Sequence, residues 1–341
     1  MNEMLALLPE YKTLWEPSGA GADVQRTELF GDMYADTIHS FLPGTWVISG
    51  HHRGRATILK LLEAVRKVWT QRSVFHDNQY WVGEDTICTE WFSTNGTWNG
   101  LQCRNSGLTR HAFRDRKVAE WQEYTDSEFF EEVHAGWRTI VGPELGRWLS
   151  RYERTGAPWY PNPAENEWPL DTSLTDGKAC APTHMRENLA AAAEWWQAPR
   201  GQSHALFADD VHVRFQGRRW PLGGDHRGRA ALERLFEAAR KVWPEASEIV
   251  KTELWANDDS VLVHWFTRNR TWNGQPCRNS GRAVWRFAGD KVVAWRNYVD
   301  TSFYAEVLEG WREAVGEAIG RRLPSWPEPG ERRYPDPMAH Q

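Results

Sequence analysis

The sequence has little of what marks several common classes of protein. Its four cysteines, Cys88, Cys103, Cys180 and Cys277, form no CxxC pair, which argues against a zinc knuckle or a disulfide framework. No segment approaches the roughly 18 consecutive apolar residues that a membrane-spanning helix needs, and the first residues do not have the pattern of a signal peptide. The net charge of −5 provides no general basic field for nucleic acid or anionic lipid. We therefore expect a cytoplasmic protein without nucleic-acid or membrane partners.

Motifs that hold cofactors are also missing. The chain has no Walker loop, no GxGxxG turn after a predicted strand and no HExxH helix. We therefore expect no cofactor and no metal, so that any chemistry would come from acid and base side chains. Tryptophan is unusually frequent for a protein of this length, with 22 copies. Such rigid aromatic side chains fill protein cores, and an excess of them also suits a pocket for a planar aromatic ligand.

A repeat with a shift of 174 residues organises the chain. GHHRGRATILKLLEAVRKVW, from Gly50, recurs as GDHRGRAALERLFEAARKVW from Gly224. TWNGLQCRNSG, from Thr97, recurs as TWNGQPCRNSG from Thr271. A repeat of this length indicates two copies of one domain. The predicted organisation is a first domain at residues 1–141, a Pro- and Trp-rich arm and linker at 142–183, a second domain at 184–316 and a C-terminal arm at 317–341.

Each copy predicts the same order of elements. A helix at about residues 24–34 or 186–196 precedes a short strand at about 38–42 or 211–216, and an amphipathic helix follows. Runs of β-branched and aromatic residues come next, joined by an Asn-Gly pair that is typical of a tight hairpin turn. A third strand closes the meander before a last short helix. We expect an α+β fold, in which a curved antiparallel sheet wraps around N-terminal helices.

This order of elements, with the motifs FADD, RGR and WRNYVD, resembles the SnoaL-like group of the nuclear transport factor 2 superfamily. The resemblance covers residues 24–140 and 186–316. It implies two tandem cone-shaped, cystatin-like domains that pair as a pseudo-dimer, and it leaves open a homodimer of such pseudo-dimers. The group includes polyketide cyclases, ketosteroid isomerase, scytalone dehydratase and limonene epoxide hydrolase. The motifs therefore indicate the fold better than the reaction.

The register of the predicted hairpin decides which side chains face a pocket. With a two-residue loop at Asn99 and Gly100, Thr94 lies opposite Asn105, and Glu90 shares their face. The next turn fits either two residues or three, and only three would place the strand that carries Trp121 on the same face. The resemblance favours three, because limonene epoxide hydrolases have a pocket carboxylate at the position of Glu123.

Two sets of pocket residues follow from this register. The first pocket is expected to display His39, Phe41, Glu90, Phe92, Thr94, Cys103, Asn105, Trp121 and Glu123. The second is expected to display His212, Arg214, His264, Phe266, Arg268, Cys277, Asn279, Trp295 and Asn297. An apolar cavity raises the pKa of carboxylates and lowers that of imidazoles, which makes such groups useful as acids and bases near neutral pH. The predicted catalytic residues are therefore His264, His212, Glu90, Glu123 and His39. The predicted substrate-binding residues are Arg214, Arg268, Asn279, Asn297, Trp295, Phe266, Asn105, Trp121 and Phe92.

The two predicted pockets differ mainly in charge, since Glu90 and Glu123 are replaced by His264 and Asn297. We therefore expect only one complete catalytic site, in the second pocket. The resemblance and the missing cofactor motifs favour a cofactor-independent lyase. Such an enzyme would remove water or formaldehyde from a small hydroxylated aromatic substrate, such as a lignin-derived diarylpropane diol. The alternatives are a polyketide cyclase or isomerase and a non-catalytic small-molecule binding protein.

Overall fold

The computed structural model describes residues 3–13, 15, 31–154, 158–168, 177–198, 204–327, 330, 332–334 and 336–340. The chain forms two compact units. The first unit comprises Met1–Gly156, Ser173–Thr175 and Arg332–Gln341, and the second comprises Ala157–Thr172 and Asp176–Glu331. Each unit thus contains one repeat together with a segment that follows the other repeat in the sequence.

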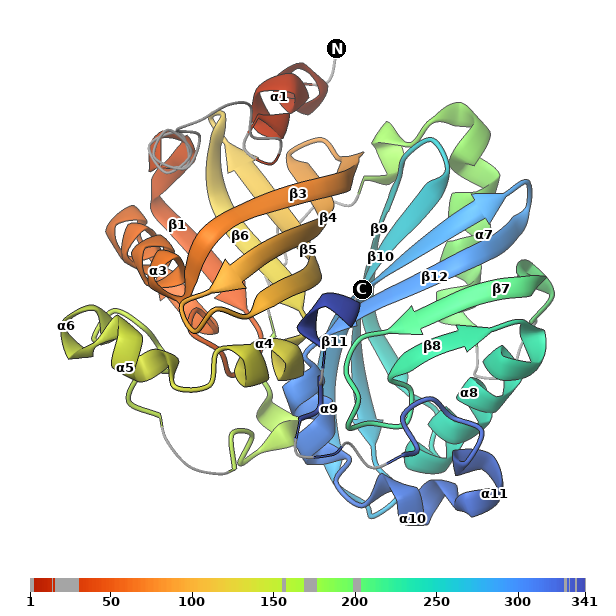
Figure 1. The fold of residues 1–341 in the computed structure, drawn as a ribbon. Helices are drawn as coiled ribbons and strands as arrows, with labels where there is room; N and C mark the ends of the chain where they lie inside the picture. Colours follow the sequence, from red (N-terminus) through yellow and green to blue (C-terminus); the bar gives the residue numbers. More distant parts are fainter. Residues whose placement is uncertain are drawn as a thin grey trace. The chain divides into compact units, whose positions relative to one another are not determined.

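The first unit is built on a six-stranded mixed sheet in the order β2-β1-β6-β5-β4-β3 (Figure 1). Strand β1 runs parallel to β6, and all other neighbours are antiparallel. The helices and strands of this unit are α1 (Glu3–Lys12), β1 (Tyr34–Leu42), β2 (Gly50–Arg53), α3 (Arg55–Val68), β3 (Trp69–Val82), β4 (Thr86–Thr97), β5 (Gln102–Arg114), β6 (Lys117–Thr125), α4 (Ser127–Val133), α5 (Trp137–Val141) and α6 (Pro143–Gly146).

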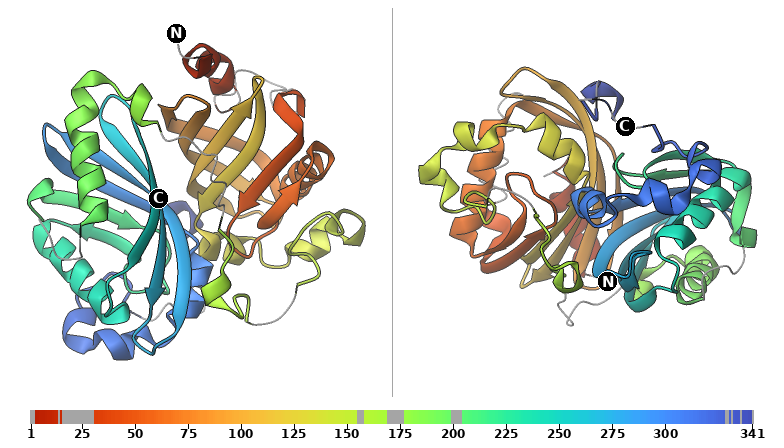
Figure 2. Two further views of the ribbon diagram at one scale, coloured as in Figure 1. Left: turned by 180° about the vertical axis from the view of Figure 1, so that it is seen from behind. Right: turned by 90° about the horizontal axis from the view of Figure 1, so that it is seen from below.

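The second unit has a sheet of the same order, β8-β7-β12-β11-β10-β9. Its helices α7 and α8 lie on the same side of this sheet (Figure 2). The elements are α7 (Arg186–Gln197), β7 (Phe207–Phe215), β8 (Gly224–Arg227), α8 (Arg229–Val242), β9 (Glu248–Ala256), β10 (Ser260–Arg270), β11 (Pro276–Ala288), β12 (Lys291–Val299), α9 (Thr301–Val307), α10 (Trp311–Val315) and α11 (Glu317–Gly320). Short 3-10 helices are η1 (Pro163–Glu165), η2 (Lys178–Cys180), η3 (Thr183–Met185), η4 (His204–Leu206) and, in the first unit, η5 (Pro337–Ala339).

The shared topology confirms the predicted α+β fold with two curved sheets. Each sheet is mixed rather than antiparallel throughout, because the first strand of each repeat pairs in parallel with the last. The predicted helix at 186–196 is confirmed as α7. Of the helix predicted at 24–34, residues 24–30 lie outside the described residues, and Tyr34 already belongs to β1. In the described ranges no helix is both long and apolar enough to cross a membrane.

The repeated HRGR motif sets the start of the long helix in each repeat. Gly54 and Gly228 precede α3 and α8 with φ angles of 85° and 80°, a region that favours glycine. The following arginine contacts a carboxylate on the first strand, with Arg55 3.0 Å from Asp36 in the first unit. The motif therefore begins the long helix and pairs its second arginine with a carboxylate of the first strand.

The histidine of the same motif closes the connection before β2 and β8. His52 Nε2 donates to the carbonyl oxygen of Ile48 at 3.1 Å, and His226 Nε2 donates to that of Leu222 at 2.9 Å. Both rings are buried, and burial lowers the pKa of each to about 4. These histidines are therefore neutral in the folded protein at physiological pH.

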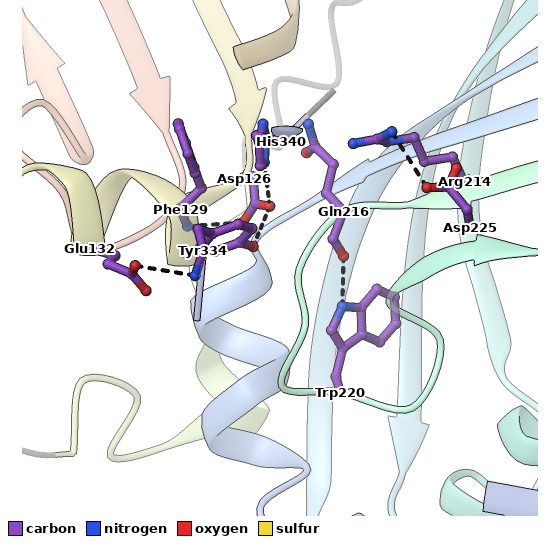
Figure 3. A network of polar contacts seen from close by, with 9 residues as sticks. All are labelled: Asp126, Phe129, Glu132, Arg214, Gln216, Trp220, Asp225, Tyr334 and His340. Atoms are coloured by element: carbon purple, nitrogen blue, oxygen red, sulfur yellow. Dashed lines mark hydrogen bonds and ion pairs between the residues drawn. The ribbon is translucent and has the colours of Figure 1, made fainter. Parts of the chain in front are cut away.

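A tyrosine that follows the second repeat packs into the first unit. The Tyr334 hydroxyl donates to Asp126 Oδ2 at 2.6 Å, and the Glu132 carboxylate accepts from the Tyr334 amide at 3.1 Å (Figure 3). The Asp126 carboxylate also caps α4 by accepting from the Phe129 amide at 3.2 Å. His340 Nε2 contacts the same carboxylate at 2.9 Å.

The second unit contains the matching arrangement. Tyr160, which follows the first repeat, donates its hydroxyl hydrogen to Asp300, and Glu306 accepts from the Tyr160 amide at 2.9 Å. Asp300 caps α9 by accepting from the Phe303 amide at 3.1 Å. Tyr160 begins the sequence YPNP and Tyr334 begins YPDP, so the two tyrosines are equivalent. Each belongs to the unit formed by the other repeat.

Candidate functional site

The loop between β4 and β5 determines which residues share the inner face of the first sheet. The Thr97 amide donates to the Leu101 carbonyl at 3.0 Å, so three residues form the loop, and Gly100 has a φ of 82°. The equivalent Thr271 amide donates to Gln275 at 2.9 Å in the second unit. The predicted two-residue loop is wrong, and the register differs from the prediction by one residue.

This single residue changes the face of a whole strand, because side chains alternate along it. Ser93, not Thr94, pairs with Asn105, and Trp91 pairs with Gly107. A Cβ atom at Gly107 would lie 2.4 Å from the Trp91 ring, so the glycine leaves room for the indole to cross the strand. Gly281 has the same relation to Trp265 in the second unit.

Most of the predicted ionisable site residues, on the first strand of each repeat as well as on β4 and β10, lie on the opposite face of their sheet. In the register they share this outer face with one another and not with Asn105, Trp121, Asn279 or Trp295. The prediction that they face a pocket is therefore wrong for His39, Phe41, Glu90, Phe92, Thr94, His212, Arg214, His264, Phe266 and Arg268.

These outer-face residues have other polar partners. Asp225 lies 2.8 Å from His212 Nε2 and 3.6 Å from Arg214 Nη1 (Figure 3 shows the arginine pair). His264 Nδ1 lies 3.3 Å from Glu253 Oε2, and Arg268 pairs with Glu248 at 3.0 Å. In the first unit, His39 Nε2 contacts His51 Nδ1 at 2.9 Å.

The next turn places the remaining predicted residues on the inner face. Its loop has two residues, with φ angles of 49° at Asp115 and 59° at Arg116, so the predicted three-residue turn is wrong. A β-bulge lies further along the same pair of strands, between the partners of Ala112 and Phe113. The bulge shifts the register by one residue, which brings Trp121 and Glu123 onto the face of Asn105, as expected.

A cavity of about 730 Å³ opens between the inner face of the second sheet and helices α7 and α8. We call it the Trp cavity, because six tryptophans line it: Trp195, Trp196, Trp220, Trp243, Trp265 and Trp295. Among the predicted substrate-binding residues, Asn279, Asn297 and Trp295 line it.

The tryptophans of the cavity hold one another in fixed orientations. Trp196 stacks on Trp265, with ring centroids 5.9 Å apart and planes inclined by 16°. Trp195 meets Trp295 edge to face at 5.8 Å. Trp220 donates its indole hydrogen to the Gln216 carbonyl at 2.8 Å (Figure 3). The walls of the cavity therefore present aromatic surfaces to a ligand.

Polar side chains interrupt this aromatic lining at two places. At the hairpin end, Thr267 donates to Asn279 Oδ1, and Asn269 Nδ2 donates to Thr267 Oγ1 at 3.3 Å. Asn279 Nδ2 and Asn269 Oδ1 have no hydrogen-bond partner among the described residues, and the same holds for Asn297 Oδ1 further along the sheet. Only 2% of Asn279 and 3% of Asn297 is exposed. A buried polar group without a partner costs about 1–3 kcal/mol.

In the first unit the equivalents of Asn269 and Asn279, which are Asn95 and Asn105, have hydrogen-bond partners for both amide atoms. Ser93 Oγ donates to Asn105 Oδ1 at 2.5 Å, and Asn105 Nδ2 donates to Asn95 Oδ1 at 2.8 Å. Asn95 Nδ2 in turn donates to Ser73 Oγ at 3.2 Å. Two copies of one motif therefore have different hydrogen bonds, and the copy with unpartnered amide atoms lines the Trp cavity.

The inner face of the first unit carries a separate set of ionisable groups. Glu123 Oε2 accepts from Thr109 Oγ1 at 2.6 Å, and the Tyr11 hydroxyl contacts His111 Nδ1 at 2.8 Å. Burial raises the pKa of the Tyr11 hydroxyl above its usual range. In the second repeat, Asn297 replaces the glutamate and tryptophan replaces the histidine.

Neither Tyr11 nor His111 is predicted by the patterns in the sequence. Tyr11 lies on α1, a helix that no motif of the repeat predicts. His111 lies on β5 six residues beyond Asn105, the last residue of that strand predicted to face the pocket. The second repeat has tryptophan at the equivalent position, so a comparison of the copies does not indicate a histidine there. The described residues contain no group of three or more His, Cys, Asp or Glu residues that could hold a metal ion.

The solved structures that this chain is similar to each match about two fifths of it. An NTF2-like protein from Burkholderia xenovorans LB400 has 16% sequence identity and a TM-score of 0.30, over 36% of this chain and 88% of that one. A protein with a cystatin-like fold from Xanthomonas campestris has 18% identity and a TM-score of 0.33, over 42% and 100%. A protein from Bacillus subtilis, provisionally named an isomerase, has 15% identity and a TM-score of 0.34, over 40% and 97%.

The comparison with curated proteins found no match. One family model does match, over the second repeat. Residues 190–295, which run from α7 to β12 and include most of the Trp cavity, match the SnoaL-like domain.

Proposed function

We propose that the second unit binds a small planar aromatic molecule in the Trp cavity. The observation that carries this proposal is a cavity of about 730 Å³ lined by six tryptophans and by buried amides that lack partners. Its volume falls within the roughly 300–1,000 Å³ of small-molecule sites. Each offset-stacked or edge-to-face ring pair contributes about 0.5–1.5 kcal/mol beyond the burial of area.

Binding without chemistry suits the Trp cavity better than the predicted lyase reaction does. The histidines and arginines expected to transfer protons and hold an oxyanion, such as His264 and Arg268, lie on the other face of the sheet. The charged side chains among its described lining residues are basic, from Arg240 and Lys251, and no carboxylate lines it. We therefore assign recognition of the ligand, rather than proton transfer, to this cavity.

Acid and base chemistry is the second candidate function, and we place it in the first unit. Glu123 and His111 share the inner face of neighbouring strands, because Thr109 pairs with Glu123 and His111 pairs with Trp121. Diagonal neighbours of this kind are about 7–8 Å apart. In a dehydration, one group would remove a proton from carbon while the other protonates the departing hydroxyl, which yields water and a carbon–carbon double bond.

The binding proposal is tested by titrating the protein with two-ring phenolic compounds while tryptophan fluorescence and heat of binding are recorded. We expect saturable binding of one molecule per chain. Trp196→Leu should weaken it at least tenfold, because the stacked pair with Trp265 is lost. The control is Trp121→Leu, which removes a tryptophan from the inner face of the first sheet and should leave affinity unchanged. Failure of every planar aromatic compound to bind would overturn the proposal.

The catalytic candidate needs a separate measurement, which is turnover of a phenolic diol without added cofactor. Glu123→Gln should lower turnover by about 100-fold or more, since general acid–base catalysis typically contributes 10²–10⁴-fold. Asn297→Ala changes the equivalent position of the second unit and should affect binding instead. Undiminished turnover by the glutamine variant would exclude the first unit as the catalytic site.

A further inference from the structure

We propose that Asn269 and Asn279 together recognise a hydroxyl group on the ligand of the Trp cavity, and that this ligand is a two-ring phenol. The proposal rests on the proposed binding function and names the chemistry of the molecule bound. It depends on three observations: the unpartnered amide atoms, their difference from the first unit, and the position of Asn297.

The two amides offer one donor and one acceptor at neighbouring positions. Asn279 pairs with Thr267 across the strands, and Asn269 lies two residues further along the same face. The hydrogens of Asn279 Nδ2 and the oxygen of Asn269 Oδ1 have no partner in the part of the chain that the structure describes. A ligand group that both accepts and donates a hydrogen bond would satisfy both atoms.

A hydroxyl is the simplest group that meets this requirement. Its oxygen accepts from Asn279, and its hydrogen is donated to Asn269. A methyl ether, a ketone or a carboxylate can only accept, so each would leave the Asn269 oxygen buried without a donor. Because the surrounding walls are aromatic rings, the hydroxyl is best carried by an aromatic ring that lies between them.

The first unit shows that the repeated pair of asparagines does not always leave amide atoms without partners. In its equivalent residues, Asn105 Nδ2 donates directly to Asn95 Oδ1 at 2.8 Å. In the second unit Asn269 donates to Thr267 instead, where the first unit has serine. The sequence beside the pair differs by the extra methyl group of this threonine and by Arg268 and Arg270, which replace Thr94 and Gly96.

The position of Asn297 sets the length of the ligand. Asn297 pairs with Ala283, which lies four residues along β11 from Asn279. At roughly 3.3 Å per residue, the two asparagines are about 13 Å apart along the strand. Two linked aromatic rings with a polar group at each end span such a distance, whereas a single ring does not. Asn297 Oδ1 would then accept from the far end of the molecule.

The experiment compares a two-ring phenol with its methyl ether and with the corresponding single-ring phenol, each titrated by calorimetry against the full chain. We expect the methyl ether and the single-ring phenol to bind about tenfold or more weakly than the two-ring phenol. Asn279→Ala and Asn269→Ala should weaken binding of the two-ring phenol by a similar factor and leave binding of the ether nearly unchanged. Asn105→Ala and Asn95→Ala are the matched controls and should not alter binding.

The outcomes separate the two proposals. If phenol and ether bind equally well, or if Asn279→Ala weakens both equally, recognition of a hydroxyl is wrong while the aromatic cavity stands. If none of the three compounds binds, the proposed function itself fails. Asn279→Asp keeps the size of the side chain and tests loss of the donor should the alanine variant unfold, as monitored by its thermal transition.

Discussion

Tyr334 donates its hydroxyl hydrogen to Asp126 across 208 positions of sequence, at 2.6 Å. The carboxylate that receives it also caps helix α4, so one side chain holds both the helix and the arm. Because Asp126 is only 2% exposed, losing a hydrogen bond to it leaves a buried charge with fewer donors.

Tyr334→Phe should therefore destabilise the first unit. Hydrogen bonds to charged groups contribute about 1.5–3 kcal/mol, and we expect a loss of that order in the free energy of unfolding. Hydrogen exchange of the α4 amides would report it. Tyr160→Phe removes the equivalent bond to Asp300 and should increase exchange in α9 instead. Unchanged exchange in α4 of the Tyr334 variant would contradict the prediction.

Stability should fall as the solution is acidified below pH 6.5. Burial lowers the pKa of His52 and His226 to about 4 and that of His134 to about 3, compared with 6.5 for an ordinary histidine. Between these values the unfolded chain binds protons that the folded protein excludes, so unfolding is favoured as the pH falls. Each histidine contributes up to about 1.4 kcal/mol per pH unit in this window. Urea unfolding at pH 7.5, 6 and 5 would measure the slope.

His134→Leu provides the control for this pH dependence. His134 is fully buried against Phe130, neither of its ring nitrogens has a hydrogen-bond partner in the described portion of the chain, and the second repeat has leucine there. The variant should be more stable by about 1 kcal/mol or more at neutral pH, since it removes unpaired polar atoms. Its stability should also depend less steeply on pH. A variant as pH-sensitive as the wild type would show that His134 does not titrate on unfolding.

Gly281→Ala should affect both stability and binding. The added Cβ would lie 2.6 Å from the Trp265 ring, so the indole must move from its place in the Trp cavity. Forcing extra volume into a packed core typically costs about 1–3 kcal/mol. Gly107→Ala creates the same clash with Trp91 in the first unit and should lower stability without changing ligand affinity. Thermal unfolding and ligand titration of both variants would separate the two effects.

The sequence predicts the architecture better than it predicts the site. The repeat, the helix at α7 and the α+β class follow from periodicity and from motifs that occur twice, so each copy supports the other. The inner face depends on the loop at Asn99, where an Asn-Gly pair fits both two-residue and three-residue turns. Choosing two residues placed Glu90 and His264 on the wrong face. Because both repeats have the same Asn-Gly loop, the error in register occurs in both. A comparison of the two repeats therefore does not reveal it.

Other features of the sites could not be predicted from the sequence for a different physical reason. Tyr11 reaches His111 from a helix outside the repeat, so no internal comparison connects the two residues. The amide atoms of Asn269 and Asn279 differ from those of the first unit only in side-chain orientation. Such orientations depend on neighbours brought together by folding, which a pattern of residue types does not contain.

Each unit includes a segment that follows the other repeat in the sequence. The order in which the two units are synthesised is therefore the reverse of the order in which they are completed. A ribosome synthesises Asp126 early, but Tyr334 emerges only after the entire second repeat has been translated. The first unit is therefore synthesised first but completed last. During translation, Asp126 can cap α4 but cannot yet accept the hydrogen bond from Tyr334.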